Sequence, residues 1–254
     1  LTRWDVHAQP TLLEPVASRV RHTGFVHGAE LADNVAFAVS PAEAAAMDPC
    51  QRLLLEHGYM ALQHARFDRD ALDGSLTGVF LGFAGTEFAN VLAASPAGGS
   101  VYAATGSSSS IASGRLSYAL GLQGPCVTYD TACSAALAAA HAGLRALQRD
   151  ECPVGLVAGV TLMLAPGIGT SFAVAGMTSP RGRSHTFDAR ADGYARGEAC
   201  GGLVLSRQAD HTSRLSINGS AVRQDGRSAS LTAPNGQAQR SLLVAAIDDA
   251  TTTA

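Results

Sequence analysis

Short apolar segments that alternate with helical segments constrain the fold of this chain more than any other feature. Residues 78–84 (GVFLGFA) and 154–164 (VGLVAGVTLML) form apolar runs bounded by turn-forming or polar residues. Such runs are typical of strands buried on both faces, because a strand with one wet face would alternate apolar and polar residues. Helical patterns lie between them. The chain is therefore predicted to be an α/β domain with a mainly parallel sheet covered on both faces.

Capping signals mark where two helices begin. Ser40 occupies an N-cap position, Pro41 the first helical position and Glu43 the third, which together form a capping box. Asp48 and Pro49 repeat the first two signals and predict a helix to about residue 65. The remaining pattern predicts helices at residues 86–94, 107–120, 134–148 and 238–250, strands at residues 127–130, 203–207 and 215–222, and a long loop between residues 165 and 198.

Composition and charge exclude several classes of protein. The 254 residues are 46% hydrophobic and 15% charged, which suits one large α/β domain with a sizeable core. A net charge of −3, with arginine supplying all 18 basic residues, offers no basic surface for nucleic acid. No unbroken apolar run reaches the ~18 residues of a membrane span. We therefore expect no nucleic-acid and no membrane partner.

The cysteines and histidines predict neither disulfides nor a metal site. The five cysteines are odd in number and form no CxxC pair: Cys50, Cys126, Cys133, Cys152 and Cys200. Free thiols suit a reducing compartment, so we expect a cytoplasmic protein. The histidines show no HxxxH or HExxH spacing, and no glycine-rich phosphate loop occurs. No metal and no nucleotide cofactor is predicted.

One cysteine stands at a predicted strand-to-helix turn, in the segment GPCVTYDTACSAA. Residues 127–130 alternate at the strand period, and after Cys133 leucines recur on one helical face. At a helix N-terminus, unpaired N–H groups and the helix dipole favour a thiolate and could stabilise the oxyanion of an attacked thioester. Alanines would let the helix pack close to the sheet, with its first turn at the bottom of a channel.

Less reactive interpretations stand beside this one. A small buried cysteine is a common core residue, and Cys126 is expected to be buried in this way rather than to be a second reactive thiol. His141 lies roughly 12 Å along the helix from Cys133 and is expected to be a packing residue. Several charged residues could form an acid–base cluster but are expected to form ion pairs that fix a loop: Asp130, Asp188, Arg190, Asp192, Arg196 and Glu198.

Five segments, in order from about residue 40 to 240, resemble the modular polyketide type of β-ketoacyl synthase. GPCVTYDTACSAA is similar to the active-site pattern GPS-hydrophobic-TxDTACSS, and SPAEAAAMDPCQRLLLEHGYMAL to SPREAxxMDPQQRLLLExxWEAL. SSSSIASGRLSYALGLQGP resembles the segment before the active-site strand. FDARADGYARGEACGGLVLSR resembles FDxxADGYVRGEGxGxVVLKR, and RQDGRSASLTAPNGQAQ resembles NQDGRTxGxTAPNGxxQ. Departures are Cys50 for the usual Gln, Cys126 for Ser, and Ala199-Cys200 for Gly-Val or Gly-Cys.

The resemblance implies a thiolase-like fold of two pseudo-equivalent α/β halves with a mixed sheet covered by helices. It implies a homodimer and an acyltransferase activity in which Cys133 accepts an acyl group as a thioester. A decarboxylative Claisen condensation with a malonyl-type extender then lengthens that group. Both substrates would arrive on the phosphopantetheine of an acyl carrier protein, and the domain itself would need no cofactor.

The family's second half is expected to be missing. Its HGTGT and NxGH segments, which carry two catalytic histidines, do not occur, nor does the family's first strand or any lysine. Residues 1–254 are thus interpreted as a partial ketosynthase domain, the nucleophile half, which should not condense by itself. Two alternatives stay open: a non-catalytic structural or dimerising module, and acyl transfer to Cys133 without condensation.

Overall fold

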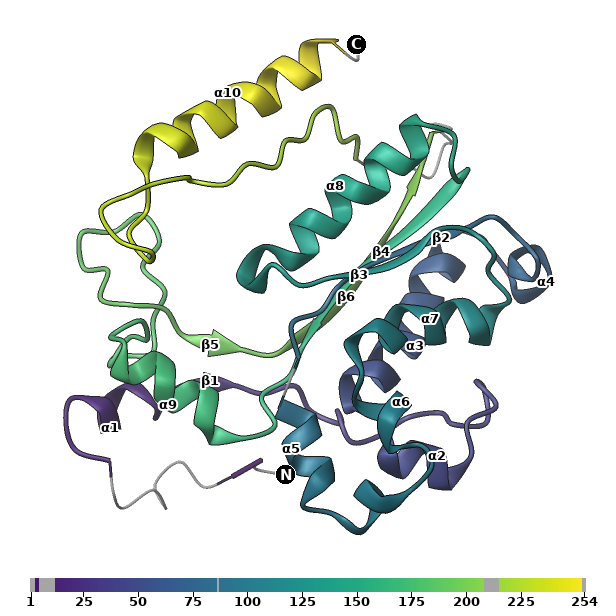
Figure 1. Cartoon of the computed structure of the whole chain (residues 1–254), viewed down its shortest axis with the longest axis horizontal. Helices are drawn as coiled ribbons and strands as arrows, with labels where there is room; N and C mark the ends of the chain where they lie inside the picture. Colours follow the sequence, from purple (N-terminus) through teal and green to yellow (C-terminus); the bar gives the residue numbers. More distant parts are fainter. Residues whose placement is uncertain (1–2, 5–11, 86, 208–214, 253–254) are drawn as a thin grey trace.

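A mixed four-stranded sheet forms the centre of the molecule (Figure 1), in strand order β3-β2-β4-β6. The structure is a computed structural model that describes residues 3–4, 12–85, 87–207 and 215–252. Strands β2 and β3 and strands β2 and β4 pair in parallel, whereas β6 pairs antiparallel with β4. The α/β prediction is confirmed, and the sheet is mixed as the resemblance implied. The strands are β2 (Gly78–Gly82), β3 (Cys126–Tyr129), β4 (Val154–Thr161) and β6 (Ala199–Ser206).

Helices cover both faces of this sheet (Figure 1). Along β2, Val79 and Leu81 pack into one cluster with α3 and α7, while Phe80 packs into a second cluster with α8. Neighbouring side chains of a strand point to opposite faces, so an apolar run such as β2 fills both layers. The covering helices are α3 (Pro49–His64), α7 (Ser109–Leu120) and α8 (Ala135–Gln148).

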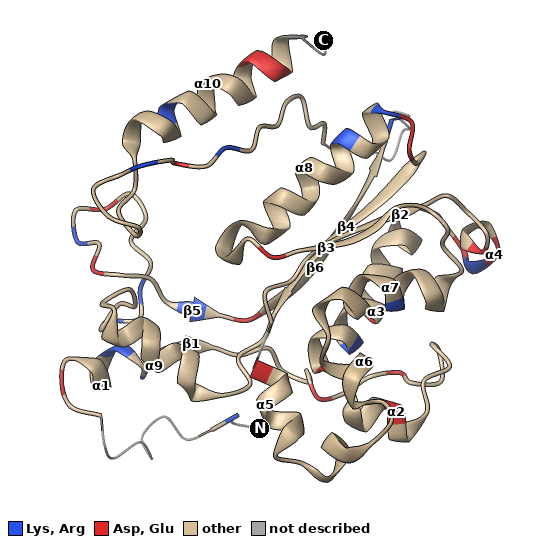
Figure 2. Cartoon of the chain, in the orientation of Figure 1, with Lys and Arg blue, Asp and Glu red and all other residues tan. Residues whose placement is uncertain are grey.

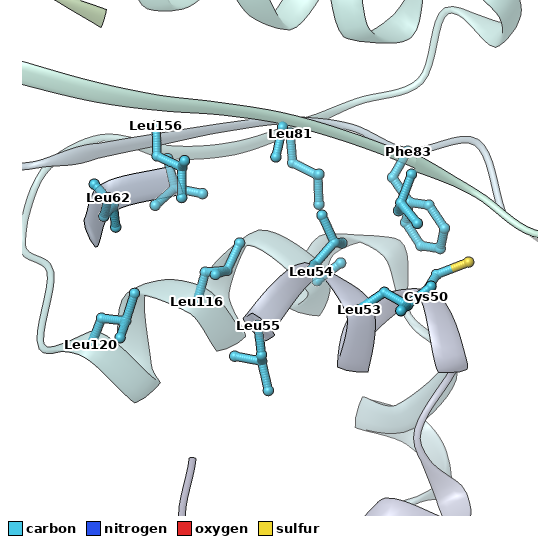
Figure 3. Packing of buried hydrophobic residues seen from close by; sticks show 14 of the residues in the cluster. Cys50, Leu53, Leu54, Leu55, Leu62, Leu81, Phe83, Leu116, Leu120 and Leu156 are labelled. Atoms are coloured by element: carbon cyan, nitrogen blue, oxygen red, sulfur yellow. The ribbon is translucent and has the colours of Figure 1, made fainter. Parts of the chain in front are cut away.

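The larger core lies between the sheet and the pair α3 and α7. Figure 3 shows Leu54 of α3 and Leu116 of α7 among Leu81 and Leu156 of the sheet. All four of these leucines are 0% exposed. Burying a leucine side chain contributes about 1.5–3 kcal/mol each. This layer therefore anchors the two central strands of the sheet, β2 and β4.

The two predicted helix starts are confirmed. Ser40 Oγ accepts a hydrogen bond from the Glu43 N–H at 3.1 Å, and Asp48 Oδ1 accepts one from the Cys50 N–H at 2.7 Å. The Glu43 carboxylate pairs with Arg115 of α7. Its charge thus links the helix α2 (Pro41–Ala46) to α7.

The remaining elements are short or peripheral, apart from the long helix α10. Strands β1 and β5 form a separate parallel pair. The bounds are α1 (Val16–Arg19), β1 (Thr23–Gly24), α2 (Pro41–Ala46), α4 (Arg69–Leu72), α5 (Glu87–Ala93), the 3-10 helix η1 (Pro96–Gly99), α6 (Ala103–Ser107), the 3-10 helix η2 (Ala132–Ser134), α9 (Pro166–Val174), β5 (Arg196–Gly197) and α10 (Gly236–Thr252).

Several predicted boundaries shift by a few residues. The helix expected at 107–120 is divided, because Ser108 has an extended backbone (ψ 128°) between α6 and α7. Strand β4 ends before the expected residue 164, and β6 begins before the expected residue 203. The predicted helix at 86–94 corresponds to α5, and its first predicted residue lies outside the described residues.

Two predictions of secondary structure were wrong. The expected loop at 165–198 contains α9, whose glycines, serine and threonine masked a helix that Pro166 begins. The expected strand at 215–222 is irregular, although Leu215, Ile217 and Val222 are apolar. The backbone N–H of Ser220 instead donates a hydrogen bond to Asp249 Oδ2 on α10 at 2.9 Å. A strand needs a partner strand for its backbone groups, and this segment has none among the described residues.

Candidate active site at the start of α8

Cys133 lies where the sequence predicted, between a strand and the N-terminus of a helix. Strand β3 ends at Tyr129, the turn η2 contains Cys133, and α8 begins two residues later at Ala135. The first turn of α8 contains no acidic residue, and the charged residue of this helix, Arg145, lies in its last turn (Figure 2). The positive end of the helix dipole at Cys133 is therefore not compensated by α8 itself.

Local hydrogen bonds hold the turn in an unusual conformation. Ala132, directly before the cysteine, has φ +52°, a left-handed value that costs a non-glycine residue about 1–3 kcal/mol. The Ala132 N–H donates to Asp130 Oδ1 at 3.0 Å, and Ser134 Oγ donates to the Thr131 carbonyl at 2.9 Å. The side chains on either side of Cys133 thus stabilise a sharp turn that presents the thiol at the surface.

Tyr194 is brought near Cys133 by a segment distant in sequence. Its N–H donates to the Met177 carbonyl at 3.0 Å, and its carbonyl accepts from the Ser179 N–H at 2.9 Å. Burial raises the pKa of the Tyr194 phenol; Arg196 lowers this pKa, and the charge of Cys133 raises it. Tyr194 lies within a segment that resembled the family, but its sequence gave no reason to single it out.

The other cysteines divide into two groups. Burial raises the pKa values of Cys50 and Cys152, and it raises the pKa of Cys200 to about 11. Cys126 is exposed, so the expectation of a buried side chain was wrong. The reason is that β3 is an edge strand, and no described strand covers its outer side. Cys133 is likewise exposed, and the described residues do not close the expected channel over it.

His141 is tied to a neighbouring segment rather than to the cysteine. Its Nδ1 lies 2.9 Å from Ser220 Oγ. Burial and the charge of Arg145 lower the pKa of His141, while Asp249 opposes this shift. The expected packing role corresponds to a hydrogen bond that holds residues 215–222 against α8.

The charged residues considered as an acid–base cluster do not form one group. Arg190 Nη2 lies 2.6 Å from Asp188 Oδ2. Hydrogen bonds from the side chain and the backbone N–H of Arg190 lower the pKa of Asp188 to about 2. Asp192 accepts hydrogen bonds from Ser179 Oγ at 2.6 Å and from Arg181 Nε at 2.8 Å. The expected ion pairs are present in this loop.

Arg196 and Glu198 lie apart from those pairs. The Arg196 guanidinium stacks 5.4 Å from the ring centroid of Phe172, while the Glu198 carboxylate is fully buried and pairs with Arg3 at 2.8 Å. Sequence reasoning did not find the partner of Glu198, because the contact spans almost the whole chain.

The fold of this chain is the thiolase-like fold of solved ketosynthases. The sequence profile of the family described as "Beta-ketoacyl synthase, N-terminal domain" matches residues 1–211. The chain belongs to this family, and its similarity is to ketosynthase domains of polyketide synthases.

Individual relatives support this assignment. The chain is 44% identical to the spectinabilin polyketide synthase system protein NorC of Streptomyces orinoci, over 90% of this chain and 10% of NorC. It is 44% identical to polyketide synthase GfsB of Streptomyces halstedii, over 97% of this chain and 5% of GfsB. A solved ketosynthase from module 6 of the bacillaene synthase of Bacillus subtilis, a cysteine-to-serine mutant, aligns with a TM-score of 0.84 at 33% identity. That alignment covers 98% of this chain and 42% of the solved chain.

The described residues contain neither a candidate membrane span nor a candidate metal site. None of the described helices has the length and apolar character needed to cross a membrane. Within the same described ranges, no three His, Cys, Asp or Glu residues are grouped so that they could hold a metal ion.

Proposed function

We propose that this chain is the nucleophile half of a ketosynthase domain and that Cys133 is its acyl acceptor. The observation that carries the proposal is the position of an exposed thiol at the N-terminus of α8, directly after the strained Ala132. Three of the other four cysteines have raised pKa values. Those three thiols are therefore less ready to form the thiolate that acts as a nucleophile.

The first reaction is an acyl transfer. The Cys133 thiolate attacks the carbonyl carbon of an acyl thioester on the phosphopantetheine of a carrier protein, and N–H groups at the helix N-terminus stabilise the oxyanion. The bond from the carbonyl carbon to Cys133 forms as its bond to the phosphopantetheine sulfur breaks. The released carrier thiolate then takes up the proton that Cys133 gave up.

The second reaction is a decarboxylative condensation. A malonyl-type thioester loses CO2, and the resulting carbanion attacks the acyl group on Cys133, whose thiolate leaves. The family's two catalytic histidines would act here, and their HGTGT and NxGH segments do not occur in these 254 residues. We infer that residues 1–254 are part of a domain and do not condense alone.

The edge of the sheet supports a homodimer. Strand β3 is an outer strand of the sheet, and its Cys126 and Val127 are exposed, Val127 by 39%. An uncovered edge strand offers backbone donors and acceptors to another strand. We infer that two copies pair through β3. By analogy with the bacterial polyketide synthases it resembles, we also infer a cytoplasmic location.

Transfer of an acyl group to Cys133 tests the proposal. The complete domain is incubated with hexanoyl-N-acetylcysteamine, and intact-protein mass spectrometry with peptide mapping locates the added acyl group. We expect one hexanoyl group on Cys133 and none in a Cys133→Ala variant, while Cys126→Ala stays acylated. If the wild-type protein is not acylated, a structural or dimerising module becomes the better interpretation. Acylation without extension by a malonyl-type thioester would indicate acyl transfer alone.

A further inference from the structure

Two buried carboxylates hold the turn that follows β4. The Met163 N–H donates to Glu198 Oε1 at 2.7 Å, and the N–H groups of Leu164 and Ala165 donate to Glu87 Oε2 at 2.6 and 3.2 Å. Glu87 is 9% exposed and the Glu198 side chain 0%. Three consecutive backbone donors are thus bound by side chains from two other parts of the chain.

The carboxylates come from two segments that meet beyond the C-terminal end of β4. Glu87 is the first residue of α5, which follows β2, and it is the acidic residue at the start of that helix in Figure 2. Glu198 lies between β5 and β6, and its Oε2 also accepts from Arg3 and from the Val26 N–H, both at 2.8 Å. Buried carboxylates are costly unless they are hydrogen-bonded. Two buried carboxylates bonded to one turn therefore indicate that the protein holds this turn in a specific geometry.

This turn is connected to Cys133 at both of its ends. Before it, Gly159 of β4 lies against the first turn of α8, where a Cβ on Gly159 would come 3.0 Å from Ala136 Cβ. After it, α9 leads to Met177, whose carbonyl binds the Tyr194 N–H. The Tyr194 phenol lies within electrostatic reach of Cys133. A displacement of the turn would therefore move the segment around Tyr194, which forms the wall beside the Cys133 thiol.

We propose that Glu87 and Glu198 are positioning residues for acyl transfer. They hold the turn after β4, and so fix α9 and the segment paired with Tyr194 relative to Cys133. This inference rests on the proposed function, since it assigns the two carboxylates to the site where the acyl group enters. The carboxylates do not touch the acyl group; they determine how much room it has.

The test compares two reactions of Cys133 in the complete domain. Alkylation by iodoacetamide reports on the thiol, while acylation by acetyl- and hexanoyl-N-acetylcysteamine reports on the thiol and on the surrounding wall. For Glu87→Ala and Glu198→Ala we expect acylation by the hexanoyl thioester to fall on the order of 100-fold, because misplacement by about 1 Å has effects of this size. Alkylation of Cys133 should change less than about threefold, and acetyl transfer should fall less than hexanoyl transfer.

Matched variants separate positioning from loss of folding. Glu87→Gln keeps an oxygen that can accept both N–H groups, so it should restore most of the hexanoyl transfer. Glu87→Asp keeps the charge but is one methylene shorter, so it should not. Glu151→Gln changes an exposed glutamate at the opposite end of β4 and should behave as wild type. The buried Cys50 and Cys152 report unfolding, because they are alkylated only if the core opens.

Each outcome decides the inference. Equal losses with the acetyl and hexanoyl thioesters, or unchanged transfer in folded Glu87→Asp and Glu198→Ala variants, would overturn it while leaving Cys133 as the nucleophile. If Glu87→Ala and Glu198→Ala unfold, the comparison of Glu87→Asp with Glu87→Gln still decides. Failure of the wild-type protein to be acylated would instead reject the proposed function.

Discussion

Gly82 at the end of β2 lies directly against Ala136 in the first turn of α8. A Cβ added to Gly82 would come within 2.3 Å of the Ala136 nitrogen, closer than any side chain can approach. Glycine at the end of β2 therefore sets how near the N-terminus of α8, and with it Cys133, can lie to the sheet.

Replacing Gly82 with alanine should displace the start of α8. Overpacking of this kind costs about 1–3 kcal/mol, and we expect urea denaturation to show a loss of stability in this range. The alkylation rate of Cys133 should also fall, because the displaced N-terminus of α8 no longer lies in the same position relative to the thiol. Gly114→Ala is the control, because nothing lies within 4 Å of an added Cβ on that helical glycine. It should stabilise the protein by about 0.5–1 kcal/mol. Equal effects of the two variants would contradict the packing argument.

The five cysteines should react with iodoacetamide in a definite order. At neutral pH we expect Cys133 and Cys126 to react before the other three, because both are exposed. Cys133 should react first, because it lies at the N-terminus of α8. Cys50 and Cys152 should react only on unfolding. The pKa of Cys200 is raised to about 11, so its labelling should increase about tenfold per pH unit between pH 7 and 10. Peptide mapping over time measures all five rates. Labelling of Cys126 as fast as Cys133 would argue against activation by the helix N-terminus.

The ion pair of Asp188 and Arg190 should make a pH-dependent contribution to stability. Because hydrogen bonds lower the pKa of Asp188 to about 2, its contribution is complete above the ordinary value of about 3.9 and is lost as the pH falls towards 2. The stability difference between wild type and Asp188→Asn should therefore shrink between about pH 4 and pH 2. In Arg190→Ala the pKa of the Asp188 carboxyl, followed by NMR, should rise toward its ordinary value but stay below it, because the backbone N–H of residue 190 still donates to Asp188 Oδ1. An unchanged titration there would assign the shift to another group.

A charge on the edge strand should prevent the inferred dimer. Val127→Lys places a charge on β3, where a second copy would pair, and charged side chains on edge strands block such pairing. Sedimentation velocity of the complete domain should show a dimer for wild type and a monomer for Val127→Lys. Val35→Lys is the control, because Val35 is 91% exposed and lies outside the sheet. A dimer that survives Val127→Lys would place the interface elsewhere.

Local sequence signals correctly predicted the elements whose formation depends mainly on neighbouring residues in the chain. The cap of Ser40 and Pro41, the apolar runs that became β2 and β4, and the position of Cys133 before α8 were all predicted correctly. Helix α9 was missed because its glycines weaken the local signal, and residues 215–222 were wrongly predicted as a strand because their apolar residues favour one. Among the described residues no strand pairs with residues 215–222, and a sequence pattern does not reveal whether a partner strand is present.

The sequence by itself determined the α/β class, the family and the strand-to-helix turn that presents Cys133, because periodicity, caps and motifs act within a few residues. Only the tertiary structure decided that Cys126 is exposed on an edge strand, that Tyr194 lies near Cys133, and that Glu87 and Glu198 hold the turn after β4. These relationships depend on which strands become neighbours. Contacts that join residues tens or hundreds of positions apart leave no local pattern to read.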